Sequence, residues 1–138
     1  VTEKRKSSKI KDTINVNQCS FDIMTAVYLS RSINFKELSY NDSVNLDIVL
    51  DKELFDLAIE YKGEKDITAQ HGKKINCIHF QIKLIEGTIF KGNEKMDVFV
   101  SNDENKIPVF VEAEIIVGSI RAYAKSIKGT KTPLKYLN

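Results

Sequence analysis

From residue 44 onward, apolar side chains alternate with polar ones, and this period of two constrains the fold more than any other feature. Successive side chains of a β-strand point to opposite faces of a sheet, so such alternation is typical of strands with one buried face. The longer alternating stretches are residues 44–50, 55–61, 78–84, 96–100 and 108–117. Shorter strands are predicted for residues 10–16 and 66–70, and a last strand leads from residue 120 to the region of Gly129.

Turn-forming residues separate the alternating stretches. The sequence Asp51-Lys52-Glu53 predicts a hairpin turn, Gly63 predicts a break, and Gly118-Ser119 predicts a further tight turn. Such signals recur about every eight to twelve residues, a spacing typical of a β-sandwich or an open barrel. We therefore predict one mainly β domain over residues 1–138, an antiparallel open barrel or sandwich with one short buried helix near the N-terminus.

The helix is predicted from a short segment that breaks the period of two. Apolar residues at positions 23, 26 and 27 have the spacing of one helix face, and the whole segment 21–29 is apolar nearly all round. Ser20 is the expected N-cap, and Asp22 in the first turn suits the helix dipole. We expect about two or three turns of heavily buried helix.

Composition limits the classes of function. Apolar residues make up 42% of the 138 residues and charged residues 29%, as in ordinary globular domains. The net charge of +2 argues against a nucleic-acid binder, and no apolar run approaches the roughly 20 residues of a membrane-spanning helix. The basic run in residues 4–11 could attract phosphates or acidic lipids, but without interleaved aromatic residues we interpret it as a solvated terminus.

Few residues are candidates for chemistry. Cys19 and Cys77 could form one disulfide, although two free, buried thiols are the preferred interpretation. His71 lies beside a glycine in a predicted turn, and His79 shares a strand face with Cys77. A structural zinc site needs four ligands, and no second pair is present. Nucleophile-elbow, P-loop and dinucleotide-binding motifs are also absent from the sequence.

The acidic sequence Asp103-Glu104-Asn105 resembles a fragment of a calcium loop. It lacks the sixth-position glycine and the closing glutamate of an EF-hand, so a plain β-turn is the preferred interpretation. We therefore assign no catalytic, cofactor-binding or metal-binding residue and expect no cofactor. The seven Phe and five Tyr residues either fill the core or line the mouth of an open barrel that holds an apolar ligand.

Two motifs together resemble a known family. Asp22, Thr25, Tyr28 and Arg31 follow the pattern Asp-x-x-Ser-x-x-Tyr-x-x-Arg, with Thr25 where Ser is usual. The second motif runs through Ser101-Asn102-Asp103, Asn105 and Pro108 and continues at Val117-Gly118-Ser119. Over residues 19–133 the chain resembles bacterial exported proteins catalogued as domain of unknown function 3108. The resemblance implies export to the periplasm or cell envelope and no established activity. It also implies that the chain is the C-terminal two-thirds of such a protein and lacks an N-terminal β segment.

Three hypotheses about function follow. The first is a non-enzymatic cell-envelope protein that binds an apolar ligand or a protein partner, by analogy with half-barrel lipoprotein carriers. The second is a hydrolase that uses His71 or His79. The third is an assembly module that pairs with another chain, or with a second copy of itself, through an open sheet edge near Val44 or Ile14.

Overall fold

The computed structural model describes residues 19–50, 52–69, 72–84, 95–115 and 118–137. Its elements are β1 (Ser20–Asp22), α1 (Ile23–Ser30), the 3₁₀ helix η1 (Phe35–Glu37), β2 (Ser43–Leu50), β3 (Glu53–Thr68), β4 (Lys74–Leu84), β5 (Lys95–Ser101), β6 (Pro108–Ile115) and β7 (Gly118–Tyr123). The predicted strand at residues 10–16, the basic run at residues 4–11 and His71 lie outside the described residues.

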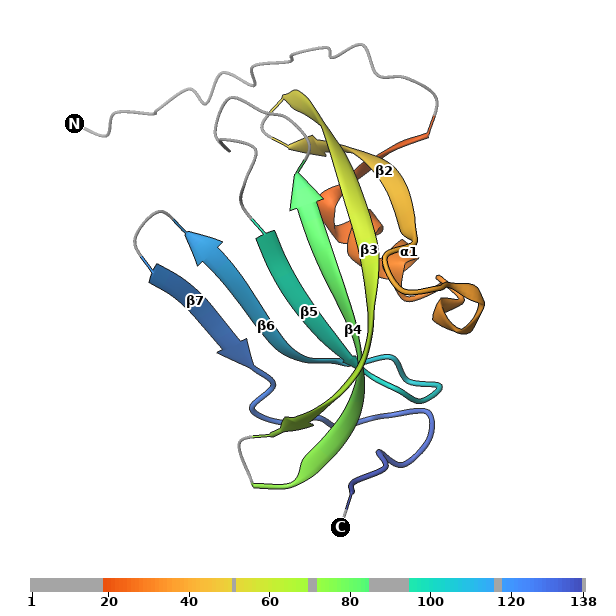
Figure 1. Ribbon diagram of the computed structural model, residues 1–138, viewed down its shortest axis with the longest axis vertical. Helices are drawn as coiled ribbons and strands as arrows, with labels where there is room; N and C mark the ends of the chain where they lie inside the picture. Colours follow the sequence, from red (N-terminus) through yellow and green to blue (C-terminus); the bar gives the residue numbers. More distant parts are fainter. Residues whose placement is uncertain (1–18, 51, 70–71, 85–94, 116–117, 138) are drawn as a thin grey trace, which may run out of the picture.

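All seven strands belong to one sheet, in which their spatial order follows the sequence from β1 to β7 (Figure 1). Each consecutive pair from β2 to β7 is antiparallel, whereas β1 and β2 are parallel. Helix α1 provides the crossover that a parallel pair requires. The two end strands, β1 and β7, are not paired with each other, so the sheet stays open. The prediction of a mainly β, largely antiparallel, open architecture is confirmed.

A β-bulge, rather than a turn, lies at Gly63. The sequence pattern predicted two separate strands here, but β3 is continuous over 16 residues. Its register against β4 shifts between Tyr61 and Glu64, and Gly63 has a φ of +89°, which a residue without Cβ adopts readily. The one extra residue on β3 exchanges the two faces of the strand. Odd-numbered β3 residues before the bulge, such as Ile59, therefore belong to one hydrophobic cluster. Ile67, an odd-numbered residue after the bulge, belongs to the other cluster on the opposite face.

The larger cluster lies on the sheet face that α1 and η1 cover. Ala26 of the helix and Phe35 of η1 pack there on residues of β2 to β5, and the Phe35 ring stacks on Phe80 with centroids 5.4 Å apart. The buried strand members are Ile48, Phe55, Leu57, Ile59, Ile78, Phe80, Val98 and Val100. The smaller cluster contains Ile67, Ile75, Cys77, Phe99, Val109 and Phe110. The apolar residues of the alternating stretches are therefore buried in two separate hydrophobic clusters.

Helix α1 confirms the predicted helix but differs from it in two details. Asp22 is the N-cap, because its carboxylate accepts hydrogen bonds from Thr25 N at 2.9 Å and from Thr25 Oγ1 at 2.7 Å. Ser20, the expected cap, instead belongs to β1. Ala26 is buried, but the Tyr28 side chain is 65% exposed because the helix covers the sheet with one face only. The expectation of burial all round was therefore wrong for Tyr28.

The C-terminal part of the chain returns to the far end of the β3–β4 hairpin (Figure 1). Strand β7 begins at Gly118 and ends at Tyr123, earlier than the predicted end near Gly129. Beyond it, Leu137 N donates a hydrogen bond of 2.8 Å to Lys74 O, and the two residues form a β-bridge. The segment in between, which sequence patterns left without a role, lines the pocket described next.

Candidate functional site

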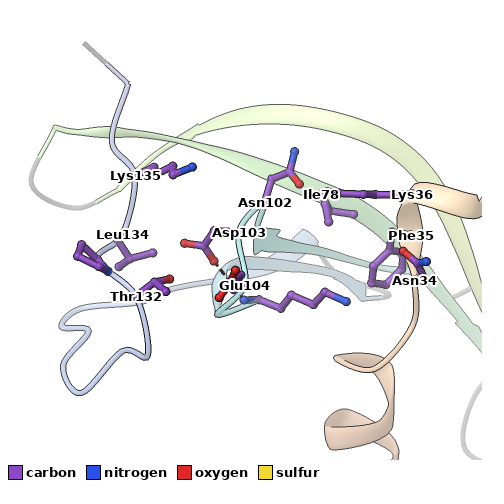
Figure 2. A pocket seen from close by; sticks show the side chains of 12 residues that line it. Asn34, Phe35, Lys36, Ile78, Asn102, Asp103, Glu104, Thr132, Leu134 and Lys135 are labelled. Carbon is purple, nitrogen blue, oxygen red and sulfur yellow. Dashed lines mark hydrogen bonds between the residues drawn. The ribbon is translucent and has the colours of Figure 1, made fainter.

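A pocket of about 690 Å³ lies where segments distant in sequence meet. One wall is formed by residues 34–36 at η1 and the other by residues 132–135 of the C-terminal segment. The loop between β5 and β6 lies between these walls, and Ile78 of β4 completes the lining. In Figure 2, Leu134 and Lys135 stand on one side of that loop, and Phe35 with Asn34 stands on the other.

The lining combines apolar and charged side chains. Its apolar members are Phe35, Ile78, Pro133 and Leu134, its cations Lys36, Lys106 and Lys135, and its carboxylates Asp103 and Glu104. Phe35 and Ile78 belong to the larger hydrophobic cluster, so the apolar part of the pocket continues the core. A pocket of this volume and composition suits a molecule with an apolar body and a polar end.

Asp103 organises the β5–β6 loop. Its Oδ1 accepts hydrogen bonds from Ser101 Oγ at 2.8 Å, Asn105 N at 2.9 Å and Lys106 N at 3.2 Å. Its Oδ2 accepts one from Asn105 Nδ2 at 3.1 Å. This is the behaviour of a carboxylate that closes a turn on its own backbone. No group of three or more His, Cys, Asp or Glu side chains that could hold a metal occurs among the described residues.

Asn105 ties the loop to the C-terminal wall. Its side chain is 5% exposed and meets Thr132 in three hydrogen bonds. Nδ2 donates to Thr132 O at 2.9 Å and to Thr132 Oγ1 at 3.1 Å, while Oδ1 accepts from Thr132 N at 3.2 Å. A buried amide that uses both its donor and its acceptor groups fixes the two segments relative to each other.

The same loop is also tied to the opposite wall. Arg31, just beyond α1, donates from Nη2 to Asn105 O at 2.8 Å, and Lys106 Nζ donates to Ile33 O at 2.8 Å. The Lys106 ammonium lies 5.7 Å from the centre of the Phe35 ring. All three segments that line the pocket are therefore joined through one six-residue connection between β5 and β6.

A second pocket of about 250 Å³ lies on the helix side of this loop. Its lining contains Tyr28, Arg31 and Ser32 together with Glu104, Asn105 and Lys106. The Arg31 guanidinium lies 5.9 Å from the centre of the Tyr28 ring. The two motifs that suggested the family resemblance thus meet in space, and several of their residues have structural roles. Asp22 caps α1, Arg31 holds the loop, and Asp103 and Asn105 fold it.

His79 lies away from both pockets, on a sheet face with polar neighbours. Its Nε2 is 2.7 Å from Asp97 Oδ1, which also accepts a hydrogen bond of 3.1 Å from Gln81 Nε2. The imidazole stacks on Phe99 with centroids 4.3 Å apart. His79 does not line either pocket. The geometry around His79 is that of a packed, hydrogen-bonded strand residue, and it does not favour the hydrolase hypothesis.

Both cysteines are free, as the preferred interpretation of the sequence has it, but only one is buried. Cys19 is exposed, whereas Cys77 is 0% exposed and its Sγ donates to Ile75 O at 3.5 Å. Burial, with smaller contributions from the charges of Asp66 and Asp103, raises the pKa of the Cys77 thiol to about 12. A thiol in this environment is a poor nucleophile and a poor metal ligand.

Thiol labelling tests this difference between the cysteines. With a pKa of about 12, only about one ten-thousandth of the Cys77 thiol is ionised at pH 8, and no solvent reaches it. Iodoacetamide at pH 8 is expected to add one label per native chain, at Cys19, and two labels in guanidinium chloride, counted by mass spectrometry. Labelling of Cys77 in the native protein at the rate of Cys19 would contradict the burial.

The pocket could not be found from sequence patterns. Its walls are the residues near η1 and the segment 132–135, neither of which shows periodicity or a chemical motif. The only advance signal was the loop Asp103-Glu104-Asn105, correctly interpreted as a turn. Asn105 forms hydrogen bonds with Thr132 and Arg31, which are distant in sequence, and only the fold brings these residues together.

Comparison with known proteins gives a family. No helix among the described residues has both the length and the apolar character needed to cross a membrane. No curated protein and no solved structure matches the chain. A family model described as "Protein of unknown function (DUF3108)" matches residues 1–125, which is most of the chain and includes both motifs. The chain therefore belongs to this family of proteins of unknown function.

Proposed function

We propose that the protein is a non-enzymatic cell-envelope protein that binds an apolar molecule with a polar end in the pocket between η1 and the C-terminal segment. The observation that carries this proposal is the pocket itself, about 690 Å³ in volume and lined by Phe35, Ile78, Pro133 and Leu134 beside three lysines. Ligand pockets in proteins have volumes of roughly 300–1,000 Å³ and are mainly apolar with a few polar groups.

The chemistry of the lining supports binding rather than catalysis. The lining residues include no histidine or cysteine, and the Asp103 carboxylate is occupied by hydrogen bonds from its own loop. A general base must lie within hydrogen-bond reach of the proton it removes, and Asp103 is turned toward its own loop, whereas Glu104, the other carboxylate of the lining, is exposed. Lys36 and Lys135 are exposed, and their ammonium groups can meet the polar end of a bound molecule. The export part of the proposal depends on the family resemblance alone.

Titration with 1-anilinonaphthalene-8-sulfonate, a probe with apolar rings and one anionic group, tests the binding proposal. We expect saturable fluorescence enhancement with the native protein. Leu134→Glu places a carboxylate in the apolar wall and is expected to weaken binding about tenfold, which corresponds to about 1.4 kcal/mol. The matched control is Lys95→Glu, which changes an exposed residue at the opposite end of β5 from the pocket loop.

Circular dichroism and the melting temperature establish whether the variants keep the native fold, because partly unfolded chains also bind this probe. Equal probe affinity for Leu134→Glu and Lys95→Glu would place the probe elsewhere and overturn the proposal for this pocket. Native mass spectrometry of protein purified from its own cell envelope then identifies any molecule that remains bound.

A further inference from the structure

Strand β7 forms an open edge of the sheet, opposite β1 (Figure 1). In the described part of the chain its only strand neighbour is β6. All six residues of β7 are exposed, including Ile120 at 57% and Tyr123 at 43%. An edge strand without a proline or bulge, and with large apolar side chains in solvent, is a template for pairing with another strand.

The backbone register shows which groups this edge offers. Ala124 N donates to Val109 O at 2.9 Å, and this pair continues the register in which Tyr123 faces Phe110. Backbone groups of an antiparallel strand point alternately to its two neighbours. Since those of Ala124 and Ala122 point to β6, those of Tyr123, Arg121 and Ser119 point to the open side.

Two rows of side chains cross the sheet and end on β7. One row lies on the sheet face that α1 covers near β1 and β2. In this row the register aligns Val44, Ile59, Ile82, Met96, Ala113 and Ile120 from β2 to β7. On the opposite face, the rings of His79, Phe99, Phe110 and Tyr123 stack in succession with centroids 4.3, 5.4 and 4.4 Å apart. An added strand therefore meets an apolar side chain on one face and an aromatic ring on the other.

We propose that this edge binds a second copy of the chain, with two β7 strands antiparallel and Ala122 facing Ala122 about a two-fold axis. In this register Arg121 of each copy faces Tyr123 of the other. The two-fold axis generates this pair twice. In both residues the backbone N–H and C=O groups point to the open side of β7, toward the second copy. On the other face, Ile120 faces Ala124 of the second copy, so the apolar rows of the two sheets join. This inference is independent of the proposed ligand pocket.

The charges of β7 select this register over its neighbours. A shift that centres the axis on Arg121 places two guanidinium groups opposite each other, which is destabilising. A shift that centres it on Tyr123 places Arg121 opposite Lys125 of the second copy, which is again a pair of like charges. In the proposed register each guanidinium, which also donates from Nε to Glu112 Oε1 at 2.7 Å, lies beside an aromatic ring.

Light scattering after size-exclusion chromatography measures the oligomeric state. We expect a concentration-dependent rise in mass from 15.7 kDa to twice that value. Ala122→Lys brings two ammonium groups together at the axis and is expected to abolish the dimer at concentrations where the native chain is dimeric. Ser43→Lys, at an exposed position of β2, is the matched control and should leave the dimer intact. A native chain that stays at 15.7 kDa up to millimolar concentration would overturn the proposal.

Disulfide cross-linking tests the register. In a Cys19→Ser background, which removes the exposed native thiol, Ala122→Cys brings two cysteines face to face within the Cα separation that a disulfide allows. We expect nearly complete cross-linking for Ala122→Cys, little for Ile120→Cys, and recovery when Ile120→Cys is combined with Ala124→Cys. Equal cross-linking of Ala122→Cys and Ile120→Cys would show random collision and would also overturn the proposal.

Discussion

Replacing Phe55 with alanine is expected to lower the free energy of unfolding by about 4 kcal/mol. Phe55 is 1% exposed and lies on β3 opposite Ile48 of β2, within the cluster that α1 covers. The substitution removes an aromatic ring from the core and leaves a cavity that the surrounding packed side chains, held in place by the pairing of β3 with β2, close only in part. Both contributions lower stability.

Urea denaturation followed by circular dichroism measures the effect as a lower midpoint at an unchanged slope. The matched control is Leu54→Ala at the adjacent position of the same strand. Its side chain points to the opposite face and is 38% exposed, so we expect a loss of about 1 kcal/mol or less. Similar losses for the two variants would mean that Phe55 does not occupy the core position described here.

Replacing Asn105 with alanine is expected to cost about 3 kcal/mol and to release the C-terminal wall of the pocket. The variant removes the three side-chain hydrogen bonds to Thr132 and leaves the Thr132 backbone groups without those partners. It also removes a donor to Asp103, so the turn itself loosens. Because these bonds connect residues 27 positions apart, their loss separates the segments that line the pocket.

Two measurements distinguish this outcome from general destabilisation. Hydrogen exchange in residues 131–137 should accelerate in Asn105→Ala under conditions where the strands stay protected. Glu104→Ala, an exposed neighbour in the same loop, is the control and should change stability by about 0.5 kcal/mol or less. If residues 131–137 exchange equally in the two variants, Asn105 does not hold the C-terminal segment.

The strands were predictable because their signal is local. In residues 44–50, for example, the alternation of Val44, Leu46 and Ile48 with polar residues follows from one buried face, and β2 occupies Ser43–Leu50. Gly63 was interpreted as a break because a glycine in a strand pattern signals a turn and a bulge equally well. Only the pairing of β3 with β4 decides between the two, and that pairing is a long-range property.

The site was much less predictable than the strands. Asp22 and Ser20 are both good N-caps, and the choice between them depends on the pairing of β1 with β2, which extends the strand through Asp22. His79 and Cys77 were correctly placed on one strand face, but the sequence does not reveal that Asp97 and Phe99 of β5 engage the histidine. The pocket depends on contacts between segments with no pattern of their own.

The order of the strands has a consequence for how the chain folds. From β2 to β6 every described strand pairs with the strands that precede and follow it in sequence, and β7 pairs with β6. Each pairing therefore closes only a short loop, and the entropy lost at each step is small. The sheet can grow one hairpin at a time, without a distant strand having to insert between two neighbours. Such a meander has a low contact order for a β protein, and the search for the native topology is correspondingly short.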